Sequence, residues 1–339
     1  MTTAHPTDRA LTAHLAPPVT GAPLDELASL LGVSADAPPE GAGRPVEIVD
    51  VGANPLVGEP PTYTPLLDAG LARLTGFEPQ PEALAALLER RGTHERFLGL
   101  AVGDGAEHDL RICAEAGFAG LLEPDVEQLR VLTDFPELAT VTDRVRVPTV
   151  RLDDVAEIER ADLLVLDAQG SELAILQHAG RLLTGTVTDT GGTGGTGDTG
   201  TSGTVAVQVE VAFHRLYTGA PVFAEVDLHL RAAGFVPHTF VTTRTWPLAP
   251  VAWADPLEAR SRHLVEADML YVRDPARLPA LGVPALRAGV LIAVGAYGCL
   301  GLGLVLLREL VQRGSLAPSA EADYRRLVAP FALPRRDTT

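Results

Sequence analysis

Short apolar runs alternate with helical patterns along the chain from Val46 onward, and turn residues follow each run. Apolar runs of about four to eight residues between turns are typical of buried strands, and strands that alternate with helices indicate a parallel sheet covered on both faces. Helices are expected after Pro81, after a capping Ser171 and from about Phe223 to Ala233. The pattern therefore predicts a doubly wound α/β fold. Its expected strands are 46–50, 74–79, 97–104, 162–167, 205–213, 235–243 and 268–274.

The same pattern divides the chain into three parts. Residues 1–44 carry scattered proline and alanine around one short helical pattern, and we expect a loosely attached extension there. The alternating pattern fills residues 45–275, which we expect to form the main domain. Within it the tract 184–204 holds nine threonines and eight glycines in 21 residues, a composition that cannot form a core. We expect this insertion to be a flexible loop.

Residues 276–339 form the third part, which we expect to be helical. Residues 288–307 are a run of 20 without a charged side chain, bracketed by Arg287 and Arg308, and that length can span a bilayer. Five glycines lower the hydrophobicity of the run, and the helical pattern continues past Arg308. The sequence therefore favours a buried helix pair packed on a domain or on a second copy of the chain, and a membrane span is the alternative.

Composition and charge restrict the partners. The formal net charge is −17 and all 27 basic residues are arginine, so lysine Schiff-base chemistry and a phosphate-loop lysine are excluded. An acidic surface repels phosphate backbones, so we expect small-molecule partners and no nucleic acid. Cys113 and Cys299 are too few for a disulfide framework or a structural zinc site, and no signal peptide opens the chain. We expect a cytoplasmic protein.

Acidic residues end two neighbouring predicted strands. Asp50 ends the strand that passes into a turn at Gly52, and Glu78 ends the next one. Ligands of doubly wound folds bind at the carboxyl ends of the strands, where an acid on the second strand can accept both hydrogen bonds of a ribose diol. Two acids suit the cation S-adenosylmethionine better than the pyrophosphate of NAD, and the spacing of Gly52 and Gly58 does not fit the dinucleotide fingerprint. We expect Asp50 and Glu78 to hold a ribosyl cation together, and another nucleotide is the alternative.

Seven motifs follow one another between residues 46 and 275. They are VDVGAN at 49–54, GFEPQPEAL at 76–84, AVGDG at 101–105, RLDD at 151–154, LLVLDAQGSELAILQHA at 163–179, VQVEVAF at 207–213 and ADMLYVRD at 267–274. In their order and spacing the chain resembles the FkbM family of S-adenosylmethionine-dependent methyltransferases, many of which methylate hydroxyls of sugars, polyketides and other secondary metabolites. The resemblance implies a Rossmann-like class I methyltransferase sheet of seven strands, the last one antiparallel. The turn after the first motif is longer and richer in proline than in related sequences.

The resemblance also assigns a cofactor site. It implies that Asp50, Gly52 and Asn54 border the methionine part of S-adenosylmethionine. Glu78 would bind the ribose, as the strand-end argument also indicates, and Asp104 would lie near the adenine. A simple turn position in V-G-D-G is the alternative for Asp104.

Methyl transfer to a hydroxyl needs a base near the strand ends. Asp167, which the resemblance places facing the methyl group and the acceptor, and Glu210 both end central strands, where burial raises the pKa of a carboxyl group. His214 is a third candidate because imidazole titrates near neutral pH, and a loop position is its alternative. Glu172 fits better as an acid at a helix start. The adjacent acids 153–154 start a helical stretch, so we expect no metal site.

The sequence therefore predicts an S-adenosylmethionine-dependent O-methyltransferase that acts on a sugar or a secondary metabolite. The alternative is a noncatalytic cofactor-binding scaffold that attaches to a membrane or to a larger synthase through its apolar C-terminal helices. N- and C-methylation stay open, as does a homodimer. Four aromatic residues either line the acceptor pocket or belong to the core. They are Tyr217, Phe223, Trp246 and Trp253.

Overall fold

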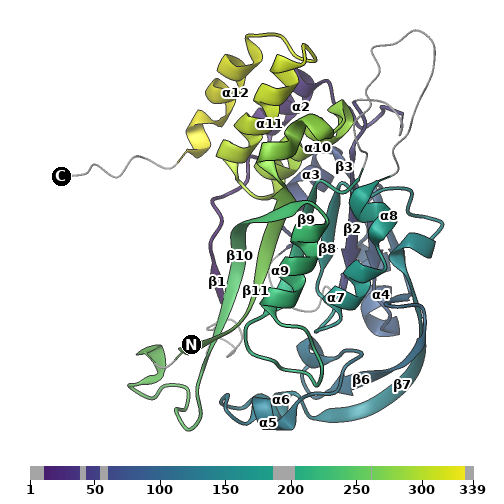
Figure 1. Cartoon of the computed structure of the whole chain (residues 1–339), viewed down its shortest axis with the longest axis vertical. Helices are drawn as coiled ribbons and strands as arrows, with labels where there is room; N and C mark the ends of the chain where they lie inside the picture. The colour runs from purple at the N-terminus through teal and green to yellow at the C-terminus, as the bar shows by residue number, and fades with distance from the viewer. Residues whose placement is uncertain (1–10, 39–42, 54–59, 186–202, 261, 333–339) are drawn as a thin grey trace.

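A mixed sheet of eight strands forms the centre of the molecule, in a computed structural model that describes residues 11–38, 43–53, 60–185, 203–260 and 262–332 (Figure 1). The strands are β1 (Leu11–Ala13), β2 (Val46–Val51), β3 (Ala72–Phe77), β4 (Glu95–Leu98), β8 (Leu163–Leu166), β9 (Ala206–Ala212), β10 (Phe235–Pro247) and β11 (Arg262–Arg273). Their order is β1-β10-β11-β9-β8-β2-β3-β4. Neighbours from β4 to β9 are parallel, whereas β11 is antiparallel to both β9 and β10.

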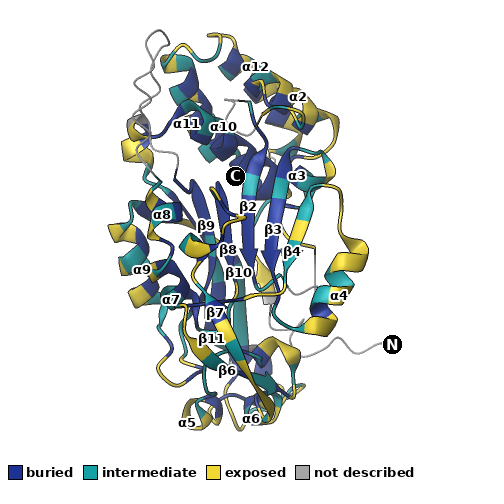
Figure 2. Ribbon diagram, turned by 90° about the vertical axis from the view of Figure 1, so that its right-hand side faces the viewer, coloured by how far each residue is buried: buried dark blue, intermediate teal, exposed yellow. Residues whose placement is uncertain are grey.

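The sheet agrees with the predicted doubly wound arrangement and adds one strand to it. Strands β2 to β11 have the expected antiparallel last strand, and β1 pairs antiparallel with β10 as an eighth strand at the edge. Successive side chains of a strand point to opposite faces, so Ile48 packs in one core and Val49 in the other. The central strands are buried along almost their whole length (Figure 2).

Helices cover both faces of the sheet (Figures 1 and 2). One face carries α7 (Glu172–Gln177), α8 (Gly180–Thr184) and α9 (Phe223–Ala232). The other carries α2 (Ala22–Leu31), α3 (Thr64–Asp68), α10 (Val283–Leu291), α11 (Leu300–Gln312) and α12 (Ala320–Val328). The helices expected at Pro81 and Phe223 begin at those residues, the first as α4 (Pro81–Arg90). Ser171 precedes α7 as expected but makes no capping hydrogen bond with its side chain.

A second, smaller sheet lies between β4 and β8 in the chain. It contains β5 (Ala101–Val102), β6 (Glu107–Cys113) and β7 (Val141–Val150), in the order β5-β7-β6. The run 97–104, which was expected to form one strand, is divided between β4 and the first strand of this sheet, and the other two strands were not predicted. Most side chains of β7 are exposed or only partly buried, so the strand has no continuous apolar run from which it could be predicted. This sheet and the short helices α5 (Val126–Leu129) and α6 (Phe135–Leu138) form the lower end of the molecule in Figure 1.

Residues 11–38, the longer described part of the N-terminal segment, pack against the core, and for them the expectation of a loosely attached extension is wrong. Leu24, Leu27 and Leu31 of α2 are fully buried in the same apolar cluster as α10, α11 and α12. Their spacing of three and four residues places them on one side of the helix, and the C-terminal helices supply the complementary surface.

The apolar run 288–307 folds as two helices instead of one. α10 continues into a π-helical turn at Ile292–Ala296, the chain bends at 297–299, and α11 follows. Gly303 allows close packing here, because a Cβ at this position would lie 2.5 Å from the hydroxyl of Tyr324. In the described part of the chain, no helix combines the length and the apolar character needed to cross a membrane. Of the Gly/Thr tract, residues 186–202 lie outside the described residues.

Candidate active site

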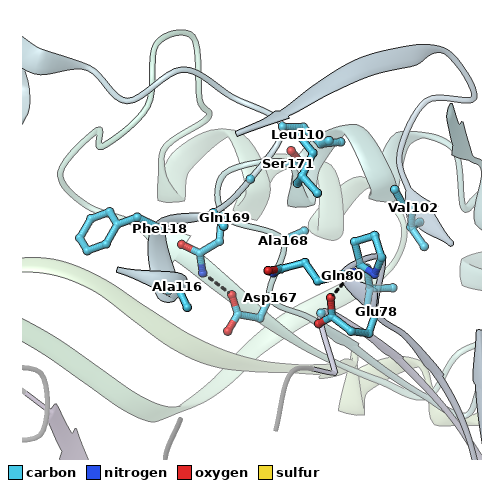
Figure 3. Close-up of a pocket in the computed structure, with 18 of the residues that line it drawn as sticks. Glu78, Gln80, Val102, Leu110, Ala116, Phe118, Asp167, Ala168, Gln169 and Ser171 are labelled. Carbon is cyan, nitrogen blue, oxygen red and sulfur yellow. Dashed lines mark hydrogen bonds between the residues drawn. The ribbon is translucent and has the colours of Figure 1, made fainter. Parts of the chain in front are cut away.

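A cavity of about 270 Å³ lies at the carboxyl ends of β2, β3 and β8 (Figure 3). The strand ends contribute Gly52, Glu78 and Asp167 to its wall. The small sheet and the loop after it contribute Val102, Leu110 and residues 115–121, and β10 and β11 close the far side. The remaining described residues of the wall are Val51, Phe77, Pro79, Gln80, Leu100, Ala101, Phe135, Ala168, Gln169, Ser171, Leu216, Arg244, Trp246 and Glu266.

Gly52 forms the turn where β2 enters the cavity wall. Its φ of +87° is a conformation that side chains rarely adopt, and a Cβ here would lie only 1.9 Å from the carbonyl oxygen of Asp167. Two backbone hydrogen bonds lock the strand ends together, from Gly52 N to Phe77 O at 3.1 Å and from Asp167 N to Val51 O at 3.0 Å. Only glycine lets these two strand ends approach so closely while the backbone of the turn faces the cavity.

Glu78 lies at the end of β3, where the strand-end argument places it, and its side chain lines the cavity (Figure 3). The residue is buried, and its Oε1 accepts a hydrogen bond from the backbone N–H of Gln80 at 2.7 Å. Burial raises the pKa of Glu78, and the hydrogen bond from Gln80 opposes that rise. The other carboxylate oxygen is left for a ligand hydroxyl. Leu100, Ala101 and Val102 provide an apolar wall to the same cavity.

Asp50 does not share this cavity, and the expectation that Asp50 and Glu78 hold a ligand together is wrong. Its carboxylate accepts a hydrogen bond from the Tyr63 hydroxyl, and it is not among the described residues that line the cavity. The reason is the strand period: Asp50 points to the face of Ile48, which α3 covers, and away from the face of Val51. Burial raises the pKa of Asp50 to about 7, against the hydrogen bond from Tyr63.

Neither of the two further cofactor predictions is among the described residues that line the cavity. Asn54 lies outside the described residues. Asp104 sits in a partly exposed turn and does not line the cavity. Its Oδ1 is hydrogen-bonded to His108 Nε2 and to Ala106 N, both at 2.9 Å, and these bonds lower the pKa of Asp104 to about 2. The alternative of a turn residue is therefore correct for Asp104, because its carboxylate is used within its own turn.

Asp167 ends β8 and presents its carboxylate to the cavity (Figure 3). Its Oδ1 accepts a hydrogen bond of 2.6 Å from the Gln169 side chain, whose own oxygen accepts one of 2.9 Å from Tyr217. The surrounding protein raises the pKa of Asp167 to about 6; the charge of Asp268 adds to this rise and that of Arg244 opposes it. The carboxylate is thus oriented by one amide, open to the cavity, and more basic than an ordinary aspartate.

Glu172 and Glu210 stand behind Asp167 and outside the described cavity wall. Glu172 Oε1 accepts backbone hydrogen bonds from Ala168 at 2.8 Å and Gly170 at 3.2 Å, so it shapes the loop after β8, as expected of an acid at a helix start. The carboxylates of Asp167, Glu172 and Glu210 lie within 4.8 Å of one another. Burial raises the pKa of Glu172 to about 7 and raises that of Glu210 well above its ordinary value. A raised pKa favours the protonated form, which lessens the repulsion among the three carboxyl groups.

His214 is not part of the site. Its Nε2 is hydrogen-bonded to the carbonyl of Gln128 at 3.0 Å, and its ring meets that of His263 edge-on at 5.3 Å. β9 ends before it, at Ala212, and the backbone N–H groups of Phe213 and His214 both donate to Val265 O. His214 is not among the described residues that line the cavity. The loop alternative is therefore the correct one for His214.

Three residues of the cavity wall come from β10 and β11 and were not in the predicted site: Arg244, Trp246 and Glu266. Arg244 and Glu266 form an ion pair across the two strands. Trp246 was one of four aromatic residues left undecided, and its buried indole donates a hydrogen bond of 2.6 Å to Thr133 O. No local sequence pattern predicts a charged pair within long antiparallel strands. Gln169, by contrast, lies in the motif LLVLDAQGSELAILQHA at 163–179 and could have been predicted from it.

Comparisons with known proteins place the chain in a family. The profile described as Methyltransferase FkbM domain matches residues 50–237, more than half of the chain. No curated protein sequence matches it. Among solved structures, the magnesium protoporphyrin IX methyltransferase (ChlM) of Synechocystis PCC 6803 with bound SAM is 11% identical, with a TM-score of 0.32 over 74% of this chain and 78% of that chain.

A TehB-like SAM-dependent methyltransferase of Corynebacterium glutamicum is likewise 11% identical, with a TM-score of 0.29 over 73% of this chain and 87% of that one. Structural scores this low support no statement about the site. The profile match carries the assignment: this chain belongs to the FkbM methyltransferase family.

Proposed function

We propose that the chain transfers a methyl group from S-adenosylmethionine to a hydroxyl group of a small metabolite, such as a sugar or a secondary metabolite. One observation carries the proposal. Glu78 and Asp167 come from β3 and β8, the two neighbours of β2, and both carboxylates face one cavity beside the Gly52 turn. In that arrangement Glu78 can bind a ribose at one end of the cavity, and Asp167 can accept a proton at the other.

The residues of the cavity fit the cofactor. The Gly52 backbone lies in the wall without a side chain, and Glu78 has one carboxylate oxygen free for a ribose hydroxyl. The described wall carries four acids and one base, and this balance favours a cationic ligand over a phosphate. They are Glu78, Glu115, Asp167, Glu266 and Arg244. When bound, S-adenosylmethionine supplies a methyl group that is already activated for transfer.

Asp167 is the proton acceptor of the proposed reaction. A carboxyl group whose pKa is about 6 is mostly ionised at neutral pH, yet it holds a proton more tightly than an ordinary aspartate. Gln169 fixes one of its oxygens and leaves the other for the acceptor hydroxyl. Phe118, Phe135 and Trp246 give the same cavity an apolar surface, as a site that binds a small organic acceptor requires.

Isothermal titration with S-adenosylmethionine tests the cofactor. Glu78→Gln is expected to weaken binding by about 10- to 100-fold, because a hydrogen bond to a charged group contributes roughly 1.5–3 kcal/mol. Asp104→Asn is the matched control, since it makes the same acid-to-amide change outside the cavity. Absence of binding to the unmodified chain would end the proposal, and a panel of hydroxylated metabolites assayed for S-adenosylhomocysteine then identifies the acceptor class.

The alternative of a noncatalytic scaffold attached through apolar helices is not favoured. The apolar side chains of α10 and α11 that were to make the attachment, such as Leu286, Val290 and Leu307, are buried against α2 and the sheet.

A further inference from the structure

We propose that Arg244, held by its ion pair with Glu266, is a positioning residue that keeps the carboxylate of Asp167 ionised in the cavity, where it accepts the proton of the acceptor hydroxyl. The inference rests on the proposed function for the role of Asp167. It adds a pair of residues beyond the 50–237 segment that defines the family.

The strand register places the pair. Arg244 and Glu266 face each other on β10 and β11, and Nη1 of the arginine contacts Oε1 of the glutamate. Directly after this pair the register shifts, because Thr245 pairs with Leu264 and leaves Val265 as an extra residue on β11. Such a bulge bends the ladder and re-aims the adjacent side chains. Here both members of the ion pair reach the cavity wall.

The ion pair with Glu266 engages only part of the guanidinium group of Arg244. The Glu266 side chain is only 7% exposed, whereas that of Arg244 is 35% exposed. Nε of Arg244 is buried and has no hydrogen-bond partner among the described residues. Glu266 therefore anchors one nitrogen of the arginine, and the positive charge stays close to the cavity.

Acidic groups face Asp167 from several neighbouring elements, and one base opposes them. Among the described residues of the cavity wall, Arg244 is the single basic one. Its charge opposes the rise in the pKa of Asp167 that desolvation by the surrounding cavity wall and the charge of Asp268 produce, and it acts in the same direction on Glu210. The titratable groups near Asp167 are Asp50 on β2, Glu172 on α7, Glu210 on β9, Asp268 and Glu266 on β11, and Glu78 after β3.

The charge of Arg244 therefore favours the ionised form of the Asp167 carboxyl group. Removal of Arg244 leaves Asp167 surrounded by carboxylates only, and like charges at short range disfavour ionisation. Asp167 would then be protonated in a larger share of the molecules at neutral pH, and a protonated carboxyl group cannot take the proton of the acceptor. Arg244 and Glu266 thus act on the reaction through Asp167, without accepting a proton themselves.

The test is a direct titration of Asp167 in the full chain, with neither cofactor nor acceptor present. The protein is labelled with ¹³C at the aspartate carboxyl carbons, and the Asp167 signal is identified by its loss in Asp167→Asn. Arg244→Gln is expected to raise the pKa of Asp167 by about one pH unit or more. Arg244→Lys, which keeps a positive charge, is expected to restore most of the original value.

Two further variants make the result decisive. Arg244→Gln leaves the buried Glu266 unpaired, so if it does not fold, the double variant Arg244→Gln/Glu266→Gln carries the test. A raised pKa of Asp167 is again expected, but by a smaller amount, because the loss of the Glu266 charge partly offsets the loss of the Arg244 charge. Arg73→Gln is the matched control, because Arg73 on β3 is also paired with a glutamate and also 35% exposed, but lies away from the cavity. It is expected to leave the titration of Asp167 unchanged.

An unchanged pKa of Asp167 in a folded variant without Arg244 overturns the proposal, as does a failure of lysine to restore it. A shift of the same size in Arg73→Gln would also overturn it, because net charge would then be the cause. The titration requires no turnover, so absent methyl transfer with the expected titration contradicts only the proposed function. Where turnover is measured, the acidic limb of its pH profile is expected to move to higher pH in Arg244→Gln.

Discussion

The two sides of the cavity are built from different kinds of sequence. On the cofactor side, Gly52 and Glu78 directly follow buried parallel strands, so their neighbours in the chain determine where they lie. On the acceptor side, Arg244, Trp246 and Glu266 sit within two long antiparallel strands, and their place depends on a register between segments far apart in the chain. The position of a residue at a strand end follows from the strand that precedes it in the sequence. The position of a residue within two paired antiparallel strands depends on the register between them. The first side is therefore the part that sequence motifs describe, and the second is the part that they leave open.

Asp167→Asn gives the largest expected effect and tests the separation between the cofactor side and the acceptor side, because Asp167 lies between them. An amide cannot accept the proton, so turnover is expected to fall about 10²- to 10⁴-fold. The affinity for S-adenosylmethionine is expected to stay close to that of the unmodified chain. Steady-state kinetics and isothermal titration measure the two quantities, and a variant with full turnover would remove Asp167 from the proposed mechanism.

Gly52→Ala is expected to damage the cofactor side alone. The added Cβ meets the carbonyl of Asp167, and the positive φ costs roughly 1–3 kcal/mol in addition. Thermal unfolding should show lower stability, and titration should show weaker binding of S-adenosylmethionine. Gly219→Ala is the matched control, since Gly219 has a φ of +75° but nothing within 4 Å of an added Cβ. Equal losses in both variants would mean that backbone strain, and not the close strand approach, is the cause.

The pH dependence of stability reports on Asp50, on the covered face behind the cavity. Its pKa rises from 3.8 to about 7 in the folded chain, so the unfolded chain loses this proton first as the pH increases. The contribution of Asp50 to stability is therefore full below about pH 4 and declines up to about pH 7. Asp50→Asn is expected to reduce the loss between pH 5 and pH 7 by an amount on the order of 2 kcal/mol.

Denaturant unfolding at several pH values measures that slope. Asp104→Asn is the control, because the pKa of Asp104 is lowered to about 2 and its effect falls below pH 4. An unchanged slope in Asp50→Asn would contradict a proton on the buried carboxyl group.

Tyr217→Phe gives the smallest expected effect and concerns the acceptor side. It removes the hydrogen bond that holds Gln169, which contributes roughly 0.5–1.5 kcal/mol, so turnover is expected to fall about 2- to 10-fold with unchanged cofactor affinity. Tyr271→Phe is the control, since its hydroxyl contacts Asp227 outside the cavity. A loss of cofactor affinity in Tyr217→Phe would contradict the separation of the two sides.

The sequence predicts the sheet better than the site. Apolar runs locate the seven strands of the doubly wound core, because a buried parallel strand needs apolar side chains on both faces. The same rule fails for β7, which is largely exposed, and for β1, a strand of three residues at the edge. The helical pattern near Leu24 is visible in the sequence, but whether its apolar side is covered depends on α10 and α12, which begin only at residues 283 and 320.

Within the site, the position of a residue along the chain is predictable and the direction of its side chain is less so. Asp50 and Glu78 both follow from the strand-end argument, yet Asp50 turns to the opposite face because its place in the strand has the wrong parity for the cavity. Asp104 and His214 have the chemistry of site residues and are used by local hydrogen bonds. For Asp167 the resemblance to a family and the geometry lead to the same cavity.

The C-terminal helices contact the strands on the side of the sheet that lies behind the Gly52 turn. Tyr297, at the bend between α10 and α11, donates a hydrogen bond of 2.9 Å to Gln208 of β9, and its neighbour Tyr63 contacts Asp50 under Gly52. The boundary of the family match at residue 237 therefore falls inside one shared apolar core, and cutting the chain there would remove the helices that cover one face of the central sheet. Substitutions in residues 283–328 are consequently expected to act on the strands that carry the site, through the core that they share with α2 and α3.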